Sequence, residues 1–88
     1  MIKGLEQSSQ PREKALLNGI ESLTDEELLA LLLRTGNKEQ SVLDLSSTIL
    51  REIQGMSGFH SITFVKLLSF KGINKAKAIG IMAALEFS

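Results

Sequence analysis

The sequence predicts an all-α fold of about five short helices within its 88 residues. Helix start and stop signals recur along the chain, and apolar residues fall at helical spacing. No stretch keeps the alternation of apolar and polar residues that a half-buried strand needs, and the strand-favouring residues Tyr and Trp are absent. A chain of this length builds one domain at most, with a thin core. We therefore expect a loose polar arm at residues 1–10 and a single helical domain over 11–88.

The first two expected helices have recognisable start signals. Pro11 suits the first turn of a helix, where its missing N–H costs nothing, so a short helix is expected over 12–18 with Gly19 as its stop. Thr24 and Glu27 have the spacing of a capping box, in which each side chain pairs with the backbone N–H of the other residue. The second helix should therefore begin directly after Thr24.

The middle of the sequence predicts a buried helix followed by an amphipathic one. The run at 28–33 is apolar on all sides, so its helix should be central, and Gly36 is expected to end it. Ser41 is placed to cap a third helix. The apolar residues of that helix share one face, and they are Val42, Leu43, Leu45, Ile49, Leu50 and Ile53. Gly55 and Gly58 are expected to break the chain after it.

The last third of the sequence predicts two more helices. Thr63 can cap a fourth helix over residues 64–70. Gly72 interrupts that helix, and a final helix rich in Ala and Ile is expected over 75–87.

Charge is unevenly distributed along the chain although the net charge is zero. Residues 1–55 carry six Lys or Arg and nine Asp or Glu, a net charge of −3, whereas residues 56–88 have a net charge of +3. The charged residues of the second part are Lys66, Lys71, Lys75, Lys77 and Glu86. The basic end of this polarised chain favours an anionic partner more than the total charge does.

Composition excludes several classes of protein. The longest apolar run has six residues, far fewer than the ~18 needed to span a bilayer, so no membrane partner is expected. The chain start lacks the apolar stretch of a signal peptide. Absence of cysteine excludes disulfides and thiolate zinc sites. We therefore expect a cytoplasmic protein without a cofactor.

The most informative segment is 67–78, which has the pattern of a helix-hairpin-helix module. An apolar helix end is followed by a glycine, a hydrophobic residue and a second helix with a small residue in its first turn. Gly72 permits a backbone conformation closed to other residues, Ile73 can pack between the two helices, and Ala78 lets them approach closely.

Such a hairpin is suited to holding a phosphate. It is expected to leave the amide groups of Asn74, Lys75 and Ala76 pointing outward at the positive end of a helix. Lys71, Lys75 and Lys77 would add positive charge around them. The alternative is that this segment forms only a tight helix–helix corner and binds nothing.

Two features qualify the pattern. Most such hairpins have a second glycine where this chain has Asn74; asparagine tolerates positive φ, so we expect the turn to form, although this side chain can hinder a phosphate. A shift of 36 residues places Gly36 on Gly72 and aligns several apolar positions, which suggests a degenerate double hairpin. The first unit has Glu39 where the second has Lys75, so the halves should be unequal. Two amphipathic helices also align by chance, and the sequence leaves both explanations open.

The chain resembles the N-terminal domain of the bacterial RadC family over residues 10–88. The segments that carry the resemblance are 11–14, 23–36 and 67–78. In that family, the domain precedes a larger C-terminal domain of the JAB/MPN type with a His-x-His and Asp zinc signature, and the family label is DNA repair. The resemblance therefore implies one half of a two-domain protein, whose hydrolase activity, if any, would lie in the absent C-terminal domain.

Other candidate residues have structural explanations. Asp25, Glu26 and Glu27 lie in a first helical turn, where carboxylates favour the helix dipole, so a metal site is not expected. His60 lies in a Gly/Ser-rich loop without a second ligand or base. Arg34, in the Arg-Thr-Gly stretch that is characteristic of the resembling family, could satisfy the last carbonyls of a buried helix end, or it could bind a phosphate.

These observations lead to two hypotheses. The first is a non-enzymatic module that grips the backbone of duplex or branched DNA through the hairpin at 71–75 and Lys77, without reading base sequence. The second is an interaction domain that positions the C-terminal JAB/MPN domain. It is motivated by the zero net charge and by apolar residues that a small core cannot all hold, among them Phe59, Phe64 and Phe87. No nucleophile–base pair supports an independent enzyme.

Overall fold

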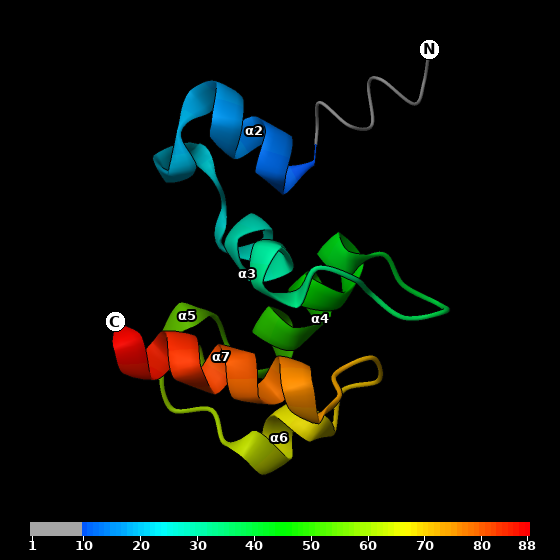
Figure 1. The fold of residues 1–88 in the computed structure, drawn as a ribbon. Coiled ribbons are helices and arrows are strands. Elements are labelled where there is room, and N and C mark those ends of the chain that lie inside the picture. Colours follow the sequence, from blue (N-terminus) through cyan, green and yellow to red (C-terminus); the bar gives the residue numbers. More distant parts are fainter. Residues whose placement is uncertain (1–9) are drawn as a thin grey trace.

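The computed structural model describes residues 10–88, so the expected arm lies, except for Gln10, outside the described residues. Every regular element within 10–88 is helical. The elements are α2 (Pro11–Asn18), the 3-10 helix η1 (Ile20–Ser22), α3 (Asp25–Leu33), α4 (Val42–Glu52), α5 (Met56–Phe59), α6 (Phe64–Leu68) and α7 (Lys75–Phe87). The all-α prediction is confirmed, and α5 is a helix that the sequence analysis did not predict. In Figure 1, α3 and α4 lie between α2 on one side and the pair α6–α7 on the other.

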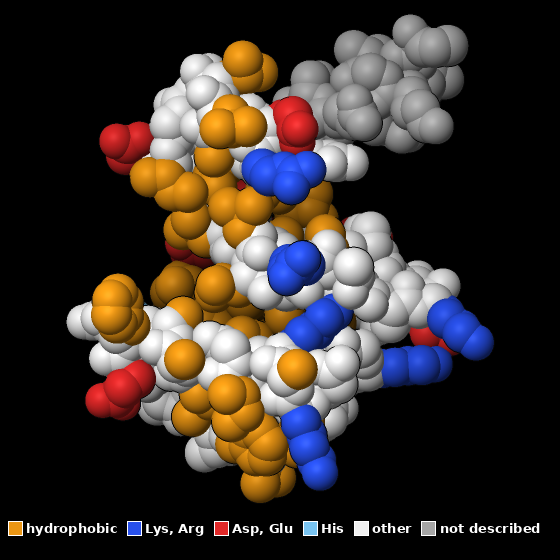
Figure 2. All heavy atoms as spheres, viewed as in Figure 1, with side chains coloured by type: hydrophobic (Ala, Val, Ile, Leu, Met, Phe, Trp, Pro, Cys, Tyr) orange, Lys and Arg blue, Asp and Glu red, His pale blue; other side chains and the backbone are white. Residues whose placement is uncertain are grey.

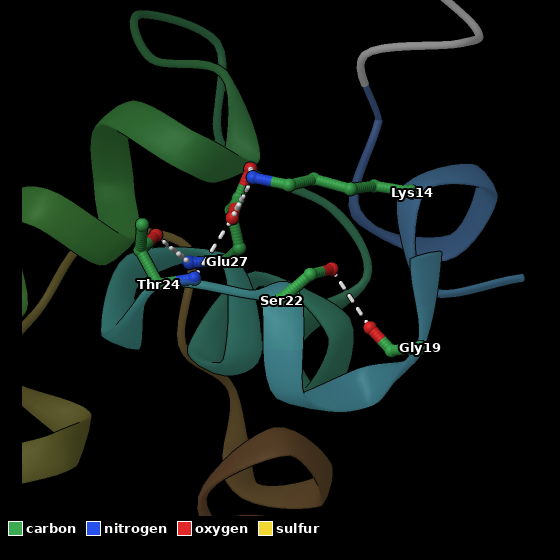
Figure 3. A network of polar contacts seen from close by, with 5 residues as sticks. All are labelled: Lys14, Gly19, Ser22, Thr24 and Glu27. Carbon is green, nitrogen blue, oxygen red and sulfur yellow. Dashed lines mark hydrogen bonds and ion pairs between the residues drawn. The ribbon is translucent and has the colours of Figure 1, made fainter. Parts of the chain in front are cut away.

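A polar network joins α2 to the start of α3, and a separate hydrogen bond from Ser22 Oγ to the Gly19 carbonyl lies within the η1 turn (Figure 3). The predicted capping box is present, since Thr24 Oγ1 accepts from the Glu27 amide at 3.2 Å and Glu27 Oε1 accepts from the Thr24 amide at 2.8 Å. Lys14 of α2 donates to the same carboxylate at 3.0 Å. The helix begins as predicted, and its capping carboxylate also anchors the preceding helix.

The end of α3 differs from the prediction. The helix ends at Leu33, and Arg34 follows with a φ of 73° while its amide donates to Ala30 O at 2.9 Å. Gly36, the expected stop, has another role, because a Cβ there would lie 2.2 Å from the Gln40 carbonyl oxygen. The glycine therefore lets the following loop fold back closely, and the left-handed turn falls on an arginine instead.

The hydrophobic core lies where α3, α4, α6 and α7 meet. Its buried residues include Leu29, Leu33, Leu45, Ile49, Leu50, Phe59, Ile62, Leu67, Ile73, Ala78 and Ile81. The one buried polar side chain of the described residues, Ser46, donates to the Val42 carbonyl at 2.8 Å. Fully burying one Leu or Ile contributes roughly 1.5–3 kcal/mol, so this cluster is the main stabilising contribution to the fold.

The segment between α4 and α6 is more ordered than its glycines suggested. Gly55 has a φ of 88° and is the N-cap residue of the short helix α5. A Cβ at Gly58 would lie 1.7 Å from the Ile53 carbonyl oxygen, so this glycine allows α5 to pack on the end of α4. The cap predicted at Thr63 is confirmed, but α6 ends at Leu68, two residues early, because the chain continues there in turns whose hydrogen bonds join residues three apart.

Two helix–loop–helix units therefore make up most of the described chain. The first joins α3 and α4 through residues 34–41, the second joins α6 and α7 through 69–74, and α3 packs on α7. Both loops lie on the same side of the molecule in Figure 1. The 36-residue register is not kept, because α4 begins at Val42 and α7 at Lys75, an offset of 33 residues.

Candidate nucleic-acid interface

The turn between α6 and α7 is built around one left-handed glycine. Gly72 has a φ of +100°, a conformation that side chains with a Cβ rarely adopt. Ile73 follows with an exposed fraction of 5%, and Ala78 is fully buried in the first turns of α7. These three residues have the conformation and burial that their positions in the motif predict, and they aim the start of α7 toward solvent.

Asn74 differs from its predicted conformation. Its φ of −90° and ψ of −179° are extended, and its side chain caps α7 by accepting from the Lys77 amide at 2.9 Å. The expectation of positive φ at this position is wrong, because an N-cap residue needs extended backbone for its oxygen to reach the third helical amide. The amides of Asn74, Lys75 and Ala76 have no acceptor within residues 10–88 and mark the positive end of a 13-residue helix.

The loop of the first unit contacts this turn directly. Asn37 Oδ1 accepts from the amides of Glu39 and Gln40, both at 2.8 Å, and Asn37 Nδ2 donates to the Lys71 carbonyl at 2.8 Å. A Cβ at Gly72 would lie 3.1 Å from the Asn37 Cβ. Asn37 thus orders its own loop and holds it against the second loop, a role that the sequence did not reveal.

Two lysines of the predicted site bind the first loop. Lys71 Nζ lies 2.9 Å from Glu39 Oε2, and both side chains are largely exposed. The hydrogen bond from Lys71 lowers the pKa of the Glu39 carboxyl below its ordinary value. Lys77 Nζ donates to the carbonyl oxygen and to the hydroxyl of Thr35, at 2.8 and 2.6 Å. The exposed side chain of Lys75 has no hydrogen-bond or ion-pair partner within residues 10–88.

Arg34 follows the buried end of α3, where Leu33 is fully buried, but Arg34 itself is exposed. Within the described residues its guanidinium has no hydrogen-bond partner, and the nearby Thr35 carbonyl is satisfied by Lys77 instead. This leaves the second sequence-based interpretation, that Arg34 contacts an anion, open at an exposed position.

Two hollows adjoin this region and share Arg34. One, of ≈ 490 Å³, lies between the end of α3 and the start of α7, and its lining is Leu32, Leu33, Arg34, Thr35, Asn74, Ala76, Lys77 and Gly80. The other, of ≈ 710 Å³, is bounded by α2, α3 and the start of α4. Figure 2 shows Lys and Arg side chains gathered along this face, from α2 past the end of α3 to the two loops. Neither lining contains Asp or Glu.

Catalytic or metal chemistry finds little support in residues 10–88. No group of three His, Cys, Asp or Glu side chains there could hold a metal ion. His60 is exposed after α5, and Asp25 is exposed in the first turn of α3, where the helix dipole explains it. None of the helices described is long and apolar enough to cross a bilayer.

Comparison with known proteins places the chain in a family. A family model described as UPF0758 N-terminal matches residues 2–79. The chain is 45% identical to a UPF0758 protein of Geobacillus kaustophilus over 86 residues, 98% of this chain and 38% of the relative. It is 46% identical to one of Bacillus licheniformis (97% and 38% covered) and 42% identical to one of Clostridium beijerinckii (97% and 37%). The chain therefore spans less than two fifths of the length of these relatives.

No solved structure matches the chain significantly. The family model covers most of the chain, and the relatives are similar over nearly all of it. The match is to the N-terminal model of the family, in agreement with the resemblance to the N-terminal domain of RadC proteins. The chain belongs to the UPF0758 family.

Proposed function

We propose that this chain is a module that holds a nucleic-acid backbone without reading base sequence. The observation that carries the proposal is the start of α7, where the free amides of Asn74, Lys75 and Ala76 meet the exposed side chain of Lys75. Free amides and the dipole of a helix N-terminus favour an anion. Phosphate is the anion that nucleic acids present in regular repetition.

The two loops support this proposal in different ways. The second loop supplies the turn that exposes the start of α7, and the first loop holds it in place through Asn37. Lys71 and Lys77 already bind loop atoms, but the Lys71–Glu39 pair is exposed and such pairs contribute little to stability. A phosphate can therefore replace Glu39 as the partner of Lys71 with little loss of folding stability. Lys77 can keep its hydrogen bonds to Thr35 while it adds positive charge to the site.

The arrangement favours sequence-blind binding. Backbone contacts position a protein on a duplex but carry no base information. The site consists of backbone amides and lysines, which are groups that bind phosphate oxygens. Binding should therefore weaken steeply with salt, by a factor set by the number of phosphates that are contacted.

Titration of labelled duplex and branched DNA by fluorescence anisotropy, at two salt concentrations, tests the proposal. The variant is Lys75→Glu, which reverses the charge of the lysine at the start of α7 that has no partner within residues 10–88. The matched control is Arg51→Glu, the same charge change in the exposed last turn of α4. We expect Lys75→Glu to lower affinity at least tenfold and the control to change it much less. Absence of binding by the wild-type chain at low salt would refute the proposal.

A specific observation favours a second function, that of an interaction domain. Leu16, Leu17 and Ile20 are 79%, 73% and 54% exposed on α2 and η1, and Phe87 is 95% exposed at the end of α7. Pro11 is the only buried residue of α2. Since the relatives are more than twice as long as this chain, the partner we propose is the remainder of the longer protein, docked on these apolar residues.

Hydrogen exchange tests this second function. Amides of α2 in the 88-residue chain and in the longer protein are compared, with α7 amides near Ala78 as internal reference. We expect protection of α2 to rise in the longer protein, and to fall again when Leu16 and Leu17 are both changed to Ser. Equal protection of α2 in the two proteins would exclude docking at this helix.

A further inference from the structure

We propose that the contact with the nucleic-acid backbone continues from the start of α7 across the end of α3 to α2, with Arg34 as its central binding residue. This inference rests on the proposed function and names the path that the backbone takes. It assigns a binding role to a residue outside the hairpin, and it makes the two hollows beside that residue parts of one track.

The hollow between α3 and α7 has the chemistry of a phosphate path. Its volume is ≈ 490 Å³, and it is lined by Lys77 of α7 and by Arg34, which directly follows α3. It includes Ala76, whose amide is free at the start of α7. Gly80 lines it farther along α7, where an added Cβ would meet nothing within 4 Å. An anion held at the start of α7 therefore has open space and a second cation directly beside it.

The second hollow extends the path to α2. Its volume is ≈ 710 Å³, and its lining pairs Arg12 and Arg34 with apolar surface from Pro11, Leu31 and Val42. No Asp or Glu lines either hollow, and neither arginine forms an ion pair within residues 10–88. Guanidinium groups bind phosphate oxygens in a bidentate manner, so this lining suits the phosphates and sugars of a nucleic-acid backbone.

The backbone conformation of Arg34 indicates that the arginine side chain does not serve to stabilise the fold. Its φ of 73° lies in the left-handed region, which is costly for residues other than Gly, Asn and Asp. Glycine would fit this turn better, and the exposed guanidinium makes no hydrogen bond within residues 10–88. The arginine therefore carries a local cost that no hydrogen bond of its side chain within residues 10–88 offsets, as residues in strained conformations at functional sites do.

The positive φ of Arg34 allows an experiment that separates an effect on binding from an effect on folding. Arg34→Gly removes the side chain while relieving the backbone, so it should not lower the thermal midpoint of unfolding. Gln54→Gly is the matched control, because Gln54 is the other non-glycine residue with positive φ within residues 10–88, at 65°, and it is exposed outside both hollows. Affinity for labelled duplex DNA is measured by anisotropy over a range of salt concentrations for the wild-type chain and both variants.

We expect Arg34→Gly to weaken binding roughly three- to tenfold and to reduce the slope of log affinity against log salt by about 1, as loss of one phosphate contact does. Gln54→Gly should bind as the wild-type chain does. A second pair of variants approaches the same hollow from α7: Gly80→Glu should weaken binding more than Gly80→Gln, since the two side chains are equal in size and differ in charge.

The outcomes separate the inference from the proposed function. If Lys75→Glu abolishes binding while Arg34→Gly and Gly80→Glu leave affinity and salt slope unchanged, the track across α3 is wrong and the hairpin site alone remains. If the wild-type chain binds no nucleic acid at low salt, the proposed function fails and the inference fails with it. Weakened binding by Arg34→Gly with an unchanged thermal midpoint supports both.

Discussion

The two helix–loop–helix units make the same kind of turn by different means. In the second unit, a left-handed glycine, Gly72, turns the chain within residues 69–74. In the first unit, the left-handed position is Arg34, and the longer loop 34–41 is organised by the side chain of Asn37. One turn is therefore set by backbone freedom and the other by side-chain hydrogen bonds. The two glycines align in sequence but have different roles. Gly36 allows the loop backbone to approach closely, whereas Gly72 adopts a positive φ.

The largest expected effect on stability comes from replacing Gly36 and Gly72, one at a time, with alanine. Gly36→Ala would place a Cβ 2.2 Å from the Gln40 carbonyl oxygen and 2.6 Å from the Ser41 carbonyl carbon, so the backbone must move, at a cost of about 3 kcal/mol of unfolding free energy. Gly72→Ala has a closest neighbour at 3.1 Å and an unfavourable φ, and should cost about 1–2 kcal/mol. Urea denaturation measures both.

Gly80→Ala is the control for this comparison. Its Cβ meets nothing within 4 Å in the middle of α7, so the change should stabilise the chain by about 0.5–1 kcal/mol. If Gly36→Ala were tolerated better than Gly72→Ala, the distinction between a glycine needed for space and one needed for conformation would be lost.

A smaller effect distinguishes the asparagines of the two units. Asn37 makes two hydrogen bonds to amides of its own loop and one to the Lys71 carbonyl, so Asn37→Ala should lower the unfolding free energy by about 2 kcal/mol. Asn74 makes one capping bond, and its loss in Asn74→Ala should cost about 1 kcal/mol. Because Asn37 bridges the two loops, its variant should also speed hydrogen exchange in the second loop; exchange confined to residues 34–41 would contradict a bridging role.

The starts of α3 and α7 should also respond differently to acid. Glu27 caps α3, and the Thr24 amide, followed by Lys14, lowers the pKa of its carboxyl below the ordinary value of 4.5. A lowered folded pKa means that the unfolded chain binds the proton more tightly, so this stabilisation is present above pH 4.5 and is lost as the pH falls through the folded pKa. Asn74, which caps α7, has no charge to lose.

Thermal unfolding followed between pH 7 and pH 3 tests this difference. The wild-type midpoint should fall more steeply below pH 4.5 than that of Glu27→Gln, which has no carboxyl to titrate there. Asn74→Ala lowers the midpoint by a similar amount at every pH and serves as the reference. Parallel curves for wild type and Glu27→Gln would mean that the network in Figure 3 does not stabilise the fold.

Local signals explain which parts of this structure could be predicted. The caps at Thr24, Ser41 and Thr63 were predictable because each depends on residues within three positions along the chain. The contact of Asn37 with Lys71 joins residues 34 positions apart, and no local pattern marks it. Asn74 was assigned the wrong conformation because asparagine suits both positive φ and an N-cap, and the start of α7 decided between them.

The candidate site shows the same division. The sequence identified the lysines around the second loop and the unequal charge of the two loops, but it could not show that Lys71 and Lys77 reach across to Glu39 and Thr35. Those contacts depend on how α3 packs against α7. The hollow between α3 and α7 depends on the same packing, and the other hollow depends on how α2 and α4 lie against α3. Arg34 lines both hollows, so a residue that the sequence placed mainly at a helix end becomes the best candidate for a second contact.

The smallest expected effect concerns the charge that makes the two loops unequal. Glu39 is exposed and pairs with Lys71 across the loops, so Glu39→Gln should leave the thermal midpoint nearly unchanged. It frees Lys71 and removes a negative charge from the edge of the proposed site, so affinity for duplex DNA should rise about two- to fivefold at low salt, and less at high salt. Glu52→Gln, near Lys66 and away from both loops, makes the same charge change and should have a smaller effect. Equal gains in affinity from both variants would mean that Glu39 acts only through the overall charge of the chain. A gain confined to Glu39→Gln would show that the first loop restrains the second.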